Sequence, residues 1–166
     1  IVFLRFQNLE MLVDPLTGLG NRRRMQLYID KLSRKRKGEF SAIVFDIDDF
    51  KDINDLYGHI YGDRVLIVIS KILEKSAGNK KITCIRYGGD EFIVITPKEE
   101  VNEFIAKFKK LLSEFNDHKE FPSKIDVSIG VSEFTVNSEI NMEYIINTAD
   151  KLMYEKKKLK KRNSNK

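Results

Sequence analysis

The 166 residues contain a single cysteine, Cys84, so no disulfide can form within the chain. That scarcity fits a reducing compartment, and we expect the protein in the cytoplasm. No apolar run is long enough to span a bilayer, and the sequence shows no signal-peptide pattern. We therefore expect a domain that makes no direct contact with a membrane.

Hydrophobic residues make up 42% of the sequence and charged residues 33%, a mixture typical of a soluble globular protein. A chain of 166 residues suits one domain whose core needs no disulfides. Because the sequence begins with Ile1 rather than Met, we expect a longer protein with a sensor domain, a membrane anchor or both upstream.

The net charge is +5, and much of the excess lies in the tail 156–166. Such a tail fits nucleic acid, an anionic membrane surface, a polyphosphate ligand or simply a solvated helix end. The rest of the sequence has no zinc-finger spacing, RNP motif or stripe of lysine and arginine. We therefore expect no nucleic-acid partner.

Hydrophobic periodicity and turn residues predict the secondary structure. The predicted helices are Leu4–Val13, Leu19–Lys37, Asp49–Tyr57, Tyr61–Lys75, Glu99–Phe115 and Met142–Lys160. The predicted strands are Phe40–Phe45, Lys81–Arg86, Phe92–Thr96 and Ile125–Phe134. The Gly-Gly pair between the middle two strands predicts a β-hairpin. This order indicates an α+β fold with helices against a mainly antiparallel sheet.

Two acidic clusters follow these strands. Asp46 and Asp48 come directly after an apolar run, and strand alternation places them on the same side. Asp90 and Glu91 occupy the predicted hairpin turn. Carboxylates at a strand end and a neighbouring hairpin tip can share Mg²⁺, although a solvated and chemically idle acidic loop explains either cluster alone.

Glycines and polar residues near the acids add a second signal. Gly88 and Gly89 leave room for a bulky ligand beside the backbone, and a tight hairpin turn would need them equally. That turn would not explain an adjacent pair of acids. Asn54 and Asp63 flank a helix connection and carry groups that pair with a purine edge, although a plain connection is the simpler explanation.

The segment Arg86-Tyr87-Gly88-Gly89-Asp90-Glu91-Phe92 resembles the hallmark of the GGDEF family of diguanylate cyclases. Further matching blocks begin at Asp14, Asp46, Gly58, Val127 and Ala149, in the family's order. The resemblance implies a palm-like fold similar to that of nucleotidyl cyclases and polymerases, with the GGDEF block on a hairpin. It divides the chain into the end of an incoming signalling helix (1–13), the GGDEF domain (14–161) and a basic tail (162–166).

Position by position, the resemblance also implies a site. Two Mg²⁺ ions, replaceable by Mn²⁺, would be held by Asp46, Asp90 and the backbone carbonyl of Ile47. The implied catalytic residues are Asp90, Glu91, Lys51 and Arg86, and the last two would offset charge developing on phosphates. The implied substrate-binding residues are Phe50, Asn54, His59, Asp63, Gly88, Gly89, Lys157 and Lys161.

The implied reaction joins two GTP molecules into cyclic di-GMP with release of two pyrophosphates. One domain holds one GTP, so two domains must meet in a homodimer with twofold symmetry. The incoming helix would transmit an upstream signal by changing how they meet. Asn79 and Ile82 stand where many members carry an Arg-x-x-Asp product-inhibition site, so we expect no feedback there. Lys161 stands where an arginine is often found in the family, which keeps the positive charge but loses the bidentate geometry of a guanidinium.

The sequence leaves three other functions open. A degenerate module would bind GTP without turnover, but such modules usually lose an acid, whereas Asp46, Asp90 and Glu91 are all present. A relative making adenine-containing products would usually lack the acid found here as Asp63. A purely structural dimerisation domain would not explain the presence of Asn54, Asp63, Lys51 and Lys157. His59 fits a packing or capping role as well as a catalytic one.

Overall fold

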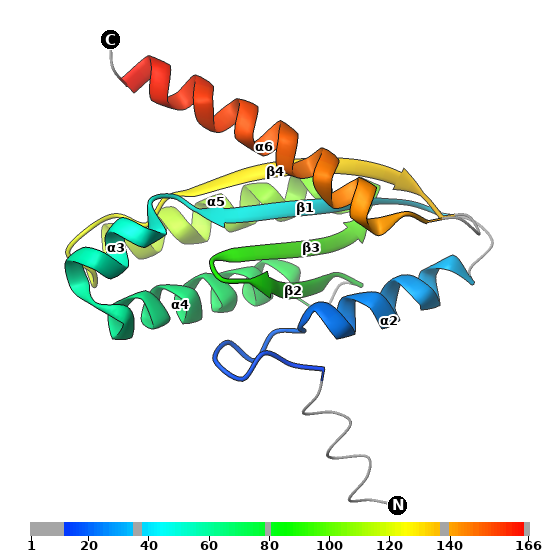
Figure 1. Cartoon of the computed structure of the whole chain (residues 1–166), viewed down its shortest axis with the longest axis horizontal. Helices are drawn as coiled ribbons and strands as arrows, with labels where there is room; N and C mark the ends of the chain where they lie inside the picture. The colour runs from blue at the N-terminus through cyan, green and yellow to red at the C-terminus, as the bar shows by residue number, and fades with distance from the viewer. Residues whose placement is uncertain (1–11, 35–37, 79–80, 137–139, 165–166) are drawn as a thin grey trace, which may run out of the picture.

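The computed structural model describes residues 12–34, 38–78, 81–136 and 140–164, with the α6 side chains described to residue 155 and at 157–158 (Figure 1). The helices are α2 (Arg22–Ser33), α3 (Phe50–Tyr57), α4 (His59–Ala77), α5 (Val101–Asp117) and α6 (Met142–Ser164), with a 3₁₀ turn at Lys98–Glu100. The strands are β1 (Glu39–Ile47), β2 (Thr83–Gly88), β3 (Glu91–Pro97) and β4 (Val127–Thr135).

The four strands form one antiparallel sheet in the order β2-β3-β1-β4, so the predicted α+β layout is confirmed. Alternation along β1 divides the core between the two faces of this sheet. Ile43 and Phe45 pack with α4 and α5, whereas Ala42 and Val44 pack with α2 and α6. Figure 1 shows the two pairs of helices on opposite sides of the sheet. No helix within the described ranges is long and apolar enough to cross a bilayer.

Helix α2 begins later than its hydrophobic pattern predicts. The pattern predicts a start at Leu19, but the side chain of Asn21 accepts a hydrogen bond from the Arg24 backbone N–H (3.1 Å) and caps the helix there. Asparagine is a favoured N-cap because its oxygen satisfies an otherwise unpaired backbone donor. The predicted end at Lys37 lies outside the described residues.

The segment before α2 is tied to the edge of the sheet. Val13 forms an antiparallel bridge with Gly20, and Gly20 forms a parallel bridge with Ile85 of β2. The predicted incoming helix falls mainly on residues 1–11, which lie outside the described part, and its last residue is in this bridge rather than in a helix. The chain therefore passes beside β2 before α2 begins.

Helix α6 lies unusually close to β4. A side chain on Gly130 would collide with the backbone oxygen of Ala149 and would meet Cβ of Met153 at 2.8 Å. Only a residue without a Cβ lets strand and helix approach to this distance. This contact sets the position of α6 over the sheet and of the polar residues that follow it along the helix.

Candidate active site

Three polar residues lie side by side on the face of the sheet that α6 covers. Asp46 follows Ala42 and Val44 at the strand period of two, so it shares their face. Across the ladder it stands opposite Glu91 on β3 and opposite Ser128 on β4. The same alternation that builds the core therefore places an acid pair and a hydroxyl beneath α6.

Lys157 of α6 reaches down to this group. Its Nζ lies 2.7 Å from Oδ1 of Asp46 and 3.0 Å from Oδ1 of Asp48. The Ser128 hydroxyl donates a 2.6 Å hydrogen bond to Asp48. Burial opposes the charge on Lys157, but hydrogen bonds to the two carboxylates outweigh it and raise the pKa of the ammonium. As alternation predicts, the two aspartates face the same way.

For three further carboxyl groups, the surroundings disfavour the charged form. Burial raises the pKa of Asp90, Glu91 and Asp150, and the charge of Asp46 raises all three further. In addition, Oδ1 of Asp150 is buried and has no hydrogen-bond partner within the described part of the chain. The sequence does not predict Asp150 as a site residue, although it precedes Lys157 by about two helical turns and so lies on the same face of α6.

The residues predicted to bind metal offer the right donor atoms. Asp46 and Asp90 provide carboxylates, and the Ile47 N–H donates to the Asp90 carbonyl (3.4 Å), which links the end of β1 to the hairpin turn. Mutually repelling, partly buried acids are stabilised by a divalent cation, and Mg²⁺ prefers such oxygen ligands. Among the described residues, no group of three or more His, Cys, Asp or Glu side chains is arranged to hold a metal ion by itself.

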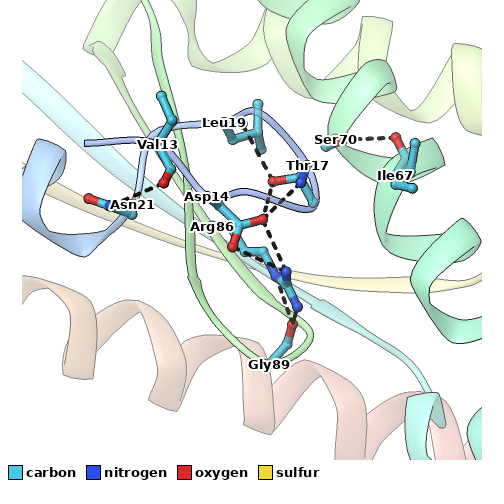
Figure 2. Close-up of polar contacts among 9 residues, drawn as sticks. All are labelled: Val13, Asp14, Thr17, Leu19, Asn21, Ile67, Ser70, Arg86 and Gly89. Carbon is cyan, nitrogen blue, oxygen red and sulfur yellow. Dashed lines mark hydrogen bonds and ion pairs between the residues drawn. The ribbon is translucent and has the colours of Figure 1, made fainter. Parts of the chain in front are cut away.

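Arg86 anchors the hairpin tip (Figure 2). Its Nη1 donates to both carboxylate oxygens of Asp14 (3.0 and 3.2 Å), and its Nε and Nη2 donate to the Gly89 carbonyl (3.1 and 2.9 Å). Thr17 donates to Asp14 through its backbone and hydroxyl (2.9 and 2.7 Å). Burial acts against ionisation of Asp14, but these hydrogen bonds lower its pKa. The guanidinium thus holds the turn, and its predicted role on phosphates stays a prediction.

Two of the residues predicted to bind substrate, Phe50 and Asn54, meet where α3 joins α4. Asn54 and Phe50 of α3 both lie against Gly62 in the first turns of α4. Asp63 follows Gly62 and is exposed, as is His59 at the start of α4. The structure thus brings Phe50, Asn54 and the neighbour of Asp63 into one junction.

The remaining predicted residues lie around these two groups. Lys51 is exposed in the first turn of α3, which follows Asp49 in a left-handed conformation (φ 55). Gly88 and Gly89 are exposed at the hairpin tip, and Gly89 has a positive φ of 37, which a side chain would disfavour. The side chain of Lys161 lies outside the described residues.

Comparison with known proteins agrees with this architecture. The family model for "Diguanylate cyclase, GGDEF domain" matches residues 11–164. Diguanylate cyclase A of Treponema denticola is 37% identical over 137 residues, 79% of this chain and 36% of that protein. An uncharacterized membrane protein of Staphylococcus aureus is 31% identical over 158 residues, 90% of this chain and 44% of its own length. The chain therefore spans less than half of these relatives.

Solved structures give the same fold. The coiled coil and GGDEF domain of DgcB from Caulobacter crescentus, in complex with c-di-GMP, has a TM-score of 0.80 at 24% identity, covering 95% of this chain and 86% of that one. The DgcB GGDEF domain with c-di-GMP has a TM-score of 0.74 at 26% identity, covering 89% and 88%. The antiparallel sheet under α6, with acids on its hairpin, defines a palm-like α+β domain. The chain belongs to the GGDEF family of diguanylate cyclase domains.

Proposed function

We propose that this chain is an active diguanylate cyclase that condenses two GTP molecules into cyclic di-GMP and two pyrophosphates. The observation that carries the proposal is the meeting of Asp46, Asp90 and Glu91 at the paired ends of β1 and β3, below Lys157. Family membership and a relative called diguanylate cyclase A support it. A GTP-binding module without turnover would have no use for every acid of this cluster.

Asp46, Asp90 and the backbone carbonyl of Ile47 would hold two Mg²⁺ ions, with Mn²⁺ as a substitute. When bound, such ions neutralise phosphate charge and favour ionisation of an attacking hydroxyl. Glu91, directly opposite Asp46, would be a further acid that this site needs. Arg86 would contribute through the hairpin turn that carries Asp90, since its contacts fix the Gly89 carbonyl.

Binding of GTP would use both parts of the site. Lys157, Lys51 and Lys161 would contact the phosphates, together with backbone N–H groups at the start of α3. At the α3–α4 junction, Asn54 and Asp63 would pair with the guanine edge. Phe50, His59 and the exposed backbone at Gly88 and Gly89 would complete the contacts.

The reaction itself needs two copies of the domain. In each half-reaction the 3′-oxygen of one GTP bonds to the α-phosphorus of the other, and pyrophosphate leaves with the bridging oxygen. We propose a homodimer with twofold symmetry, because each domain then presents its GTP to the other. An upstream sensor domain of the full-length protein would set how often the two domains meet.

The decisive experiment incubates the protein with GTP and Mg²⁺ over a range of protein concentrations and resolves the products by chromatography. We expect cyclic di-GMP from the wild type, with specific activity rising with concentration, and none from Asp90→Ala. Glu99→Ala is the matched control, because Glu99 is an exposed acid beyond the opposite end of β3. GTP bound without product at every concentration would establish the non-catalytic module instead.

A further inference from the structure

The helix α4 contains a buried glycine, Gly62, that its backbone does not require. Gly62 is absent from the residues with positive φ, so the peptide conformation there suits any residue. Glycine inside a helix costs about 1 kcal/mol relative to alanine. A glycine in this position therefore needs a reason outside the helix itself.

That reason lies on the neighbouring helix. A Cβ built on Gly62 would collide with Oδ1 of Asn54, would lie 2.9 Å from its Cγ, and would lie 3.2 Å from Cζ of Phe50. The amide of Asn54 thus fills the volume that any side chain at position 62 would occupy. The Phe50 ring makes a milder contact that a shift of a few tenths of an ångström relieves.

The backbone of Asn54 is fixed within the fold, so its side chain is the part that must yield. Its side chain is only partly exposed, and its backbone carbonyl accepts the N–H of Gly58 (2.8 Å), which closes the end of α3. Helix α4 begins at His59, directly after Gly58, so the two helices share one tight junction. A Cβ at Gly62 would consequently turn the Asn54 amide away from its place.

We propose that Gly62 is a positioning residue that sets the base preference of this site by leaving room for the Asn54 amide. The inference rests on the proposed function, in which Asn54 and Asp63 read guanine. An amide offers one donor pair and one acceptor, so its orientation decides which purine edge it matches. Gly62 would act on specificity through Asn54 without touching the base.

The test is a double-mutant cycle read by nucleotide binding. Equilibrium titration of GTP and ATP in the presence of Mg²⁺ gives the GTP-over-ATP preference of each variant. We expect Gly62→Ala and Asn54→Ala each to reduce that preference about tenfold, a typical loss for one misplaced hydrogen-bonding group. The double variant should be no worse than Asn54→Ala alone, because the group displaced by the new Cβ is already absent.

Thermal stability supplies a second readout. The effect of Gly62→Ala on the melting temperature should change sign when Asn54 is replaced by alanine. In the Asn54→Ala background, Gly62→Ala should raise the melting temperature, because alanine is the better helix former and the collision is gone. In the wild-type background it should lower the melting temperature. Asp55→Ala is the matched control: Asp55 is exposed on the same helix as Asn54, so Gly62→Ala should have its wild-type effect beside it.

The outcomes separate this inference from the proposed function. A wild type with no preference for GTP overturns the proposed function. A wild type that prefers GTP, with Gly62→Ala retaining the preference, overturns the inference and leaves the function standing. If Gly62→Ala fails to fold, the inference predicts that adding Asn54→Ala restores folding, and failure of the double variant to fold would contradict it.

Discussion

Two cationic side chains border the acidic cluster, and they are bound in different ways. Arg86 makes four hydrogen bonds to fixed partners, the Asp14 carboxylate and the Gly89 carbonyl, with only 16% of its side chain exposed. Lys157 bonds Asp46 and Asp48, and Asp46 is among the residues proposed to bind metal. One cation is therefore part of the scaffold, whereas the other is bonded to a carboxylate that we propose binds metal.

The difference follows from the chemistry of the two groups. A guanidinium presents a planar fork that matches a carboxylate, and it holds the hairpin in one geometry. An ammonium is a compact point charge on a flexible stem, so it can exchange one anionic partner for another. Arg86 keeps the Gly89–Asp90 turn in place. On the proposed function, Lys157 would exchange the carboxylates for a phosphate group of GTP.

The largest effect should come from removing the scaffold cation. We expect Arg86→Ala to lower the free energy of unfolding by about 2 kcal/mol, because it leaves the partly buried Asp14 carboxylate without its cationic partner. Cyclase activity should fall at least about a hundredfold as the turn carrying Asp90 loosens. Urea denaturation and product chromatography measure the two effects. Lys98→Ala is the control, since Lys98 pairs with Glu133 on the exposed surface and should leave both unchanged.

The close packing of β4 against α6, the helix that carries Lys157, can be tested at Gly130. We expect Gly130→Ala to lower the free energy of unfolding by about 1–3 kcal/mol, because the new methyl group meets the Ala149 backbone oxygen, which cannot rotate away. Gly88→Ala adds a Cβ in open space and serves as the stability control. Equal stability of the two variants in urea would show that α6 can shift at little cost.

If Lys157 exchanges carboxylates for phosphate, removing its charge should strengthen metal binding and weaken GTP binding. Lys157→Met should tighten Mn²⁺ binding to the nucleotide-free protein about tenfold, because the competing ammonium is gone. The same variant should weaken GTP binding by a similar factor, since a phosphate ligand is lost. Titration followed by electron paramagnetic resonance measures the metal directly. Lys158→Met is the neighbouring control, because Lys158 lies over the Tyr154 ring. Weaker Mn²⁺ binding by Lys157→Met would contradict the exchange.

The layout of this fold follows from patterns that local sequence carries. The apolar alternation of β1, the Gly-Gly turn and the helical spacing of α5 predict the sheet and its helices, and the structure confirms their order. The start of α2 could not be read from hydrophobic spacing, because the Asn21 cap, and not the position of Leu19, decides it. Helix ends depend on single polar contacts that periodicity does not record.

Within the site, strand alternation alone is enough to predict that Asp46 and Asp48 share one side, and their common partner Lys157 confirms it. Partners that come from distant segments cannot be found in this way. Asp14 meets Arg86 across the fold, and Asp150 joins the acids only because Gly130 brings α6 down onto β4. The spacing of Asp150 and Lys157 on one helix face is the available signal, but it gains meaning only once that packing is known.

The smallest predicted effect is the pH dependence of the metal-free protein's stability. The acidic cluster near Lys157 and the Asp14 partner of Arg86 should contribute to it with opposite signs. Burial and the charge of Asp46 raise the pKa of Asp90, Glu91 and Asp150, so the folded state binds these protons more tightly than the unfolded state. Stability should therefore rise as pH falls from neutral through the raised pKa values, down to the ordinary values of 3.8 for Asp and 4.5 for Glu.

Asp14 has the opposite sign, because its pKa is lowered in the folded state. Its contribution is present above its ordinary value of 3.8 and is lost as pH falls through the folded pKa, so stability should decline again in stronger acid. Urea midpoints measured against pH in a chelator test both limbs. Glu91→Gln should flatten the rise and Asp14→Asn should flatten the decline. A metal-free wild type whose stability is constant between neutral pH and the ordinary pKa of Glu would show that neither burial nor mutual repulsion destabilises the charged acids.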